Sequence, residues 1–150
     1  GTSTINFQHA ILATGSRPVQ LSLLPEDSSR VMDSTSALDL PDIPGRLLVV
    51  GGGYIGLELA TVYAALGTDI TVVEMMPNLL PGADKDLVRV LAKSLEAKFK
   101  NILNATKVMK LEEVKDGIKV TLEDTRQSRH VFLDLLGDLQ GCTKHYWLQR

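Results

Sequence analysis

Two unbroken apolar runs flank a glycine-rich segment near the middle of the chain. Residues 46–50 read Arg-Leu-Leu-Val-Val, and residues 69–74 read Asp-Ile-Thr-Val-Val-Glu. Runs of this kind, without polar alternation, are typical of strands buried on both faces of a parallel sheet. Between them, apolar residues and alanines predict a close-packed helix that opens at Tyr54 and ends at the C-terminal cap Gly67. Together the three elements predict a βαβ unit over residues 46–74.

A second, amphipathic pattern follows this unit. Asp84 is a candidate helix N-cap. Apolar residues then fall on one side of a predicted helix, namely Leu87, Val88, Leu91, Leu95 and Phe99. Charged residues take the other side, namely Lys85, Asp86, Arg89, Lys93 and Glu96. In residues 104–124, two β-rich runs separated by Lys115-Asp116-Gly117 predict a hairpin. This order of elements predicts an α/β fold: a Rossmann-like parallel sheet with helices on both faces and an antiparallel β-hairpin or meander insert.

The segment before the βαβ unit is less regular. A short apolar run that starts at His9 predicts a buried strand, which ends abruptly at the turn Thr14-Gly15-Ser16. Residues 19–45 are rich in proline, serine and aspartate, so we expect an irregular connector with one short helical turn at residues 35–40.

Composition narrows the class of protein. A chain of 150 residues, 44% hydrophobic and 23% charged, is long enough to bury a core of its own. A net charge of −2 argues against binding to nucleic acid or to an anionic membrane. The sequence has neither an apolar run of membrane-spanning length nor a signal-peptide pattern, so we expect a cytoplasmic protein. The single cysteine, Cys142, provides neither a dithiol nor a zinc-type spacing.

The glycine-rich segment carries the most informative motif. Gly51, Gly53 and Gly56 form G-x-G-x-x-G after a predicted strand and at the start of a predicted helix. Glu74 ends the second strand about 20 residues later, as the dinucleotide-binding fingerprint requires. In this interpretation, the first glycine allows the tight turn, the second lets a pyrophosphate approach the backbone, and the third allows close helix packing. The alternative is a strand-to-helix turn that serves packing alone.

Three side chains near the motif are candidate contacts. A Glu74 carboxylate accepts hydrogen bonds from an adenosine ribose diol and repels a 2′-phosphate, and no basic residue follows it before Lys85. NAD is therefore favoured over NADP. Glu58 lies near the helix start, where the dipole favours a carboxylate, although a solvated surface glutamate is the alternative. Tyr54 either covers a bound ring or is a packing aromatic.

These segments resemble a known family. "ILATGSRP", "RLLVVGGGYIGLELATVYAALG" and "DITVVEMMPNLLPGADKDLV" are similar to the central region of the dihydrolipoamide dehydrogenases, flavin-dependent members of the pyridine nucleotide-disulfide oxidoreductase family. The resemblance implies an NAD site in which Glu74 binds the adenosine ribose and Val108 lies against the adenine. It implies that the nicotinamide end and pyrophosphate lie on Gly51, Gly52, Gly53, Tyr54, Ile55, Gly56, Leu57 and Glu58. Thr14, Gly15 and Ser16 would lie beside FAD in the full-length enzyme.

The resemblance also implies a division of the chain into parts. Residues 1–18 would be a remnant of an FAD-binding domain, residues 19–45 a connector, residues 46–124 the NAD-binding domain, and residues 125–150 a divergent tail. This tail contains Cys142, but no role is assigned to it.

The implied activity belongs to a longer protein. Family members oxidise dihydrolipoamide through a protein disulfide and FAD and reduce NAD, as homodimers within 2-oxo acid dehydrogenase complexes. This chain has neither the catalytic cysteine pair nor the His-Glu pair, so we expect a fragment that cannot turn over alone, with no catalytic residue and no metal site. Two alternatives stay open: the NAD-binding domain of another flavoprotein reductase, acting on mercuric ion, another disulfide or oxygen, and a stand-alone nucleotide-binding module.

Overall fold

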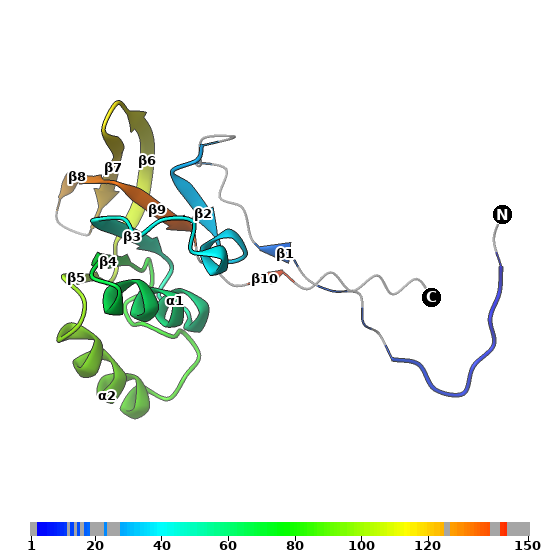
Figure 1. Ribbon diagram of the computed structural model, residues 1–150. Helices are drawn as coiled ribbons and strands as arrows, with labels where there is room; N and C mark the ends of the chain where they lie inside the picture. Colours follow the sequence, from blue (N-terminus) through cyan, green and yellow to red (C-terminus); the bar gives the residue numbers. More distant parts are fainter. Residues whose placement is uncertain are drawn as a thin grey trace.

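A five-stranded parallel sheet forms the centre of the fold (Figure 1). The computed structural model describes residues 3–11, 13, 15, 17–18, 23, 28–124, 127–138 and 142–143. In spatial order, the strands of the sheet are β2 (Val31–Asp33), β9 (Leu135–Asp138), β3 (Arg46–Val50), β4 (Asp69–Val73) and β5 (Asn101–Leu103). Every neighbouring pair is parallel, and β9 is hydrogen-bonded to both β2 and β3.

Helices cover one face of this sheet. They are α1 (Tyr54–Ala65), α2 (Lys85–Glu96) and the short 3-10 helix η1 (Ser36–Asp39). Because strand side chains alternate between faces, Leu47 and Val49 of β3 point toward the helices and share a core with Tyr63 of α1. The Tyr63 hydroxyl donates to the carbonyl of Ala37 at 3.0 Å, which ties α1 to η1.

An antiparallel sheet covers the opposite face (Figure 1). It consists of β6 (Lys107–Val114), β7 (Gly117–Glu123) and β8 (Ser128–Leu133). Leu48 and Val50 of β3 pack there against Ile118, Val120 and Leu122 of β7. The α/β fold class is therefore confirmed, but the prediction of helices on both faces is wrong, because the apolar side of β7 already buries the second face.

Several local predictions are confirmed by the structure. The turn at residues 115–116 joins β6 to β7. Gly67 has a φ of +101°, as a helix C-terminal glycine requires. Asp84 caps α2 by accepting the amide of Asp86 at 3.0 Å. The apolar side of α2 is only partly buried: Leu87 is 72% exposed, because the helix packs on the core through Val88 and Leu95. Neither α1 nor α2 has the length and apolar content to cross a bilayer, and the described part of the chain holds no other helix that does.

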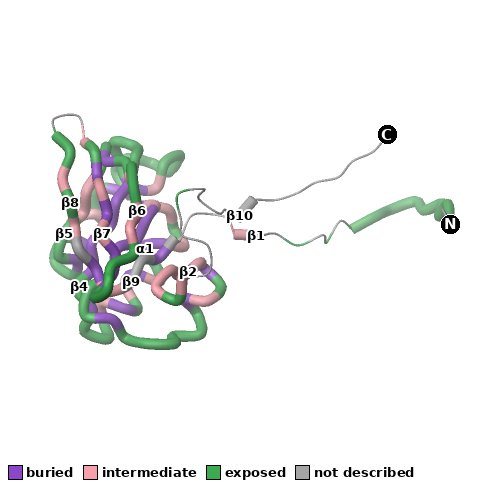
Figure 2. The backbone as a smooth tube through the Cα atoms, turned by 90° about the horizontal axis from the view of Figure 1, so that it is seen from above, coloured by how far each residue is buried: buried purple, intermediate pink, exposed green. Residues whose placement is uncertain are grey.

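The ends of the chain differ from the prediction. Residues 9–11 form no strand and are exposed, with Ile11 at 96% (Figure 2). None of the described strands pairs with this segment, so it has no sheet in which to be buried. Thr14 and Ser16 lie outside the described residues. The segment interpreted as a divergent tail supplies β8 to the antiparallel sheet and β9 to the parallel sheet. Further along, β1 (Arg17–Pro18) pairs antiparallel with β10 (Cys142–Thr143).

Candidate functional site

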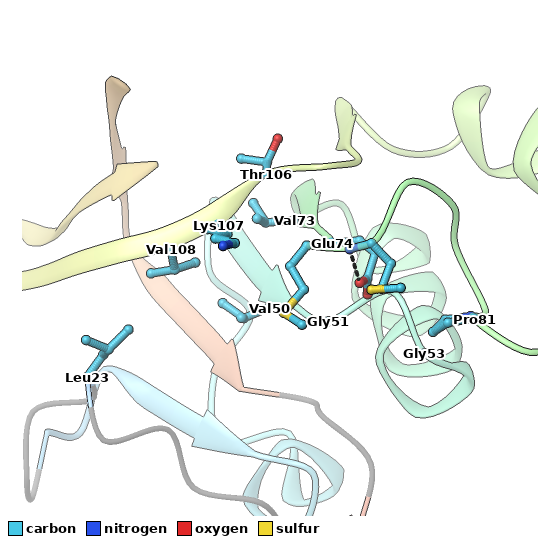
Figure 3. Close-up of a pocket in the computed structure, with 12 residues that line it drawn as sticks. Leu23, Val50, Gly51, Gly53, Val73, Glu74, Pro81, Thr106, Lys107 and Val108 are labelled. Carbon is cyan, nitrogen blue, oxygen red and sulfur yellow. Dashed lines mark hydrogen bonds between the residues drawn. The ribbon is translucent and has the colours of Figure 1, made fainter. Parts of the chain in front are cut away.

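A cavity of about 420 Å³ opens at the carboxyl ends of β3 and β4. In open α/β sheets this edge is where ligands bind. The walls come from three segments, which are the end of β3 with the glycine loop, the end of β4 with the loop that follows it, and the start of β6; Leu23 adds to the lining. Figure 3 shows Val50, Val108 and Leu23 toward one end of the cavity and Glu74, Gly53 and Pro81 toward the other.

The glycine loop forms one wall. Gly51 adopts a φ of +103°, which favours glycine, and its amide donates to the carbonyl of Val73 at 2.8 Å. Gly53 is the N-cap of α1, and a Cβ built on it would meet nothing within 4 Å. Both glycines line the cavity. The backbone at the helix N-terminus is therefore open to a ligand, as an approaching pyrophosphate needs.

Glu74 lies between two walls of the cavity and is 7% exposed. Its Oε2 accepts the amide of Gly52 at 2.7 Å, and its Oε1 accepts the amide of Met76 at 2.7 Å. Hydrogen bonds of this length to a carboxylate are of the strong, charge-assisted kind. The carboxylate that the sequence predicts to bind a ribose therefore holds two segments of the surrounding backbone in place.

Gly52 is where the two loops touch. A Cβ on this residue would lie 2.6 Å from Cδ2 of Leu79 and 3.2 Å from Cβ of Glu74. Its carbonyl accepts the amide of Leu80 at 2.9 Å, and Leu80 has a φ of +48°, which is uncommon for a residue other than glycine. The contact between Gly52 and Leu79 was not predicted, because the motif G-x-G-x-x-G leaves the residue at position 52 unspecified.

The start of β6 forms the third wall. The amide of Thr106 donates to the carbonyl of Glu74 at 3.0 Å, and Ala105 donates to Met76 at 2.9 Å. Thr106, Lys107 and Val108 then line the cavity. Lys107 adds a basic residue to the lining of the cavity that also contains Glu74, and the sequence did not indicate this because only the residues directly after that glutamate were considered.

The other predicted residues do not line the cavity. Gly52 and Gly56 are buried, and Ile55 is half-buried. Leu57 packs into the core beneath the sheet. Tyr54 is 65% exposed, and Glu58 lies exposed on α1.

Of the three predicted flavin residues, the structure describes only Gly15, which does not line the cavity. Gly15 is exposed, with a φ of +76°, and its neighbours Thr14 and Ser16 are not described.

Met75, Met76 and Pro81 line the cavity but were not predicted. Pro81 follows Glu74 closely in sequence, so the proximity of this loop to the motif was the available signal.

The far end of β3 carries the clearest electrostatic pair. Arg46 and Asp134 form a salt bridge of 2.7 Å, and the Asp134 carboxylate also accepts the Arg46 amide at 2.8 Å. The Arg46 side chain thereby lowers the pKa of Asp134 below its usual range. This pair joins β3 to the β8–β9 corner, at the opposite end of β3 from the cavity. Among residues 28–124 and the other described residues, no three His, Cys, Asp or Glu side chains gather as a metal site would require.

Comparison with known proteins gives a consistent result. Residues 1–137 match the family described as pyridine nucleotide-disulphide oxidoreductase. The chain is 50% identical over 123 residues to the dihydrolipoyl dehydrogenase of Vibrio cholerae, covering 82% of this chain and 26% of that protein. It therefore spans about a quarter of the length of that relative.

Solved structures show the same likeness. A water-forming NADH oxidase from Lactobacillus brevis, bound to NADH, superposes with a TM-score of 0.72 at 25% identity, over 85% of this chain and 29% of that one. An FAD-dependent pyridine nucleotide-disulphide oxidoreductase from Desulfovibrio vulgaris gives a TM-score of 0.73 at 26% identity, over 86% of this chain and 34% of that one.

Proposed function

The chain belongs to the pyridine nucleotide-disulphide oxidoreductase family, and from this premise we propose that it is the NAD(H)-binding region of a flavin-dependent dihydrolipoyl dehydrogenase. The observation that carries the proposal is the open backbone at Gly53, at the N-terminus of α1 and beside the buried carboxylate of Glu74. A pyrophosphate and a ribose diol are the two chemical groups that such neighbours recognise.

The residues of this chain supply binding and orientation. The N-terminus of α1 favours the pyrophosphate, because the helix dipole and free amides there attract an anion. Remaining lone pairs of the Glu74 carboxylate accept the hydroxyls of the adenosine ribose. Val108 offers an apolar surface to the adenine. When bound, NAD supplies the hydride-accepting ring, and the protein positions it.

The whole protein, in this proposal, transfers two electrons from dihydrolipoamide to NAD. Dihydrolipoamide is oxidised to lipoamide, while NAD⁺ is reduced to NADH with release of one proton. A protein disulfide and FAD outside residues 1–150 would carry the electrons between them. A homodimer that serves a 2-oxo acid dehydrogenase complex is part of the same proposal, supported by the likeness to dihydrolipoyl dehydrogenases.

Calorimetric titration of the 150-residue chain with NADH tests the binding step. We expect saturable binding to the unmodified chain and none to Gly53→Val, because the added isopropyl group occupies the open space that the pyrophosphate needs. Ala65→Val is the control, since it also introduces a valine, at an exposed position at the end of α1 away from the cavity. If Gly53→Val stays folded and binds NADH normally, this site assignment is wrong.

The longer protein allows a separate test of the substrate. We expect it to reduce NAD with dihydrolipoamide, and not to reduce mercuric ion or oxygen at a comparable rate. A faster reaction with oxygen would favour an oxidase like the solved neighbour from Lactobacillus brevis.

A further inference from the structure

We propose that Glu74 is a positioning residue that fastens the walls of the cavity to one another, and that this role is separate from any contact with ribose. The inference rests on the proposed function, because it concerns how the same site holds a dinucleotide. It adds a task to a side chain for which the fingerprint requires only a sugar contact.

The two carboxylate oxygens bind different segments of the chain. Gly52 belongs to the loop before α1, and Met76 belongs to the loop after β4. Each donates its amide to one oxygen of Glu74 at 2.7 Å. One side chain therefore bridges two loops that are separated in sequence by the whole of α1 and β4.

The backbone of Glu74 extends the same attachment to the third wall. Its amide donates to the carbonyl of Leu103 at 2.9 Å, and its carbonyl accepts the amide of Thr106 at 3.0 Å. Both partners flank the turn that leads into β6. The residue is thus fixed at its backbone to the β5–β6 connection, and at its side chain to the glycine loop and to its own loop after β4.

The bridge is compatible with ligand binding. A carboxylate has about four lone-pair positions, and the two amides use two of them. The rest are available to a ribose diol. The amide of Gly52, in contrast, is already engaged by Glu74, so we expect the pyrophosphate to be bound by other amides of the loop.

Substitution of Glu74 by glutamine separates the two roles. Glutamine keeps the length of the side chain, but its amide nitrogen cannot accept a hydrogen bond. In Glu74→Gln one of the two backbone amides therefore loses its acceptor and faces another donor. We expect the loop geometry that both halves of the dinucleotide require to loosen.

The test compares two ligands by calorimetry on the full 150-residue chain. One is NADH, and the other is the same dinucleotide built with 2′,3′-dideoxyadenosine, which cannot form the ribose contact. If Glu74 fastens the loops, Glu74→Gln weakens the binding of both ligands, and the affinity for the dideoxy ligand falls by about tenfold or more. If Glu74 acts only through the ribose, the substitution leaves the affinity for the dideoxy ligand unchanged, and the inference is overturned.

A control and a second readout complete the experiment. Glu96→Gln makes the same chemical change on the exposed surface of α2 and should alter neither affinity. Nuclear magnetic resonance of the ligand-free chain reports directly on the two hydrogen bonds of Glu74. The amide protons of Gly52 and Met76 should exchange slowly with solvent, and the resonances of both amides should shift in Glu74→Gln. Rapid exchange of either amide in the unmodified chain overturns the inference, even if the variant does not fold. If the unmodified chain fails to bind NADH, the proposed function is wrong, and this inference is wrong with it.

Discussion

Two adjacent glycines in the loop before α1 should respond very differently to the same added methyl group: one substitution destabilises the fold and the other leaves its stability nearly unchanged. Gly52→Ala places a Cβ 2.6 Å from Cδ2 of Leu79 and 3.2 Å from Cβ of Glu74, and both neighbours are buried. Gly53→Ala places a Cβ in open space, at a φ of −76° and ψ of 172° that alanine adopts without strain.

The expected magnitudes follow from these contacts. Overpacking of a buried site costs about 1 to 3 kcal/mol, so Gly52→Ala should lose that much free energy of unfolding. At about 4 °C per kcal/mol for a domain of this size, its melting temperature should fall by about 4 to 12 °C. For Gly53→Ala, a gain of about 0.4 to 1 kcal/mol from a less flexible unfolded chain offsets the poorer N-cap, leaving a change within about 0.5 kcal/mol.

Urea unfolding followed by circular dichroism measures both free energies, and equal m-values show that the two variants unfold from comparable states. The reasoning is refuted if Gly52→Ala unfolds at the same urea concentration as the unmodified chain. It is also refuted if Gly53→Ala is destabilised as much as Gly52→Ala, because the loop then tolerates no side chain at either position for a reason other than packing.

Three further outcomes are expected. NADH should bind more tightly than NADPH in calorimetric titrations, because a 2′-phosphate would approach the Glu74 carboxylate; equal affinities would show that Glu74 does not bind the ribose diol. Asp134→Asn should lower the free energy of unfolding at neutral pH by less than about 1 kcal/mol, since the pair with Arg46 is partly exposed. The pKa of Asp134 is lowered in the folded state, so this difference should be present above about pH 4 and vanish as the pH falls further; a difference that persists at pH 2 argues against the salt bridge as its cause. The chain alone, given FAD, dihydrolipoamide and NAD, should produce no NADH by absorbance, because Cys142 is its only cysteine.

Much of the fold was predictable because its strongest signals are local. The apolar runs of β3 and β4 and the turn between β6 and β7 can each be recognised within a few neighbouring residues. The short strands β2 and β9 cannot, since Leu-Leu-Gly-Asp in β9 has no strand periodicity of its own. It becomes a strand because β3 and β2 both offer it backbone partners. The pattern of β3 likewise shows that both faces are buried but not what buries them.

The candidate site was predictable to the same depth. Motif spacing placed the glycine loop and Glu74 at neighbouring strand ends, where the structure has them. The amides that bind Glu74 had no sequence signal, since every residue except proline carries one. Lys107 reaches the cavity only because β6 starts beside β4 in space. Leu57 was included through its position in the motif, whereas the helical phase of α1 turns it into the core.

The position of β9 has a consequence for how the chain folds. This strand comes from the last part of the described sequence, yet it lies between β2 and β3, so its partners precede it by about a hundred residues. Contacts of such sequence separation form slowly. During synthesis, β3, β4 and α1 leave the ribosome first, and one edge of β3 stays unpaired until residues 135–138 emerge. An open strand edge is an aggregation hazard. A shortened chain that stops at residue 124 would keep the glycine loop and Glu74 but would carry that open edge permanently.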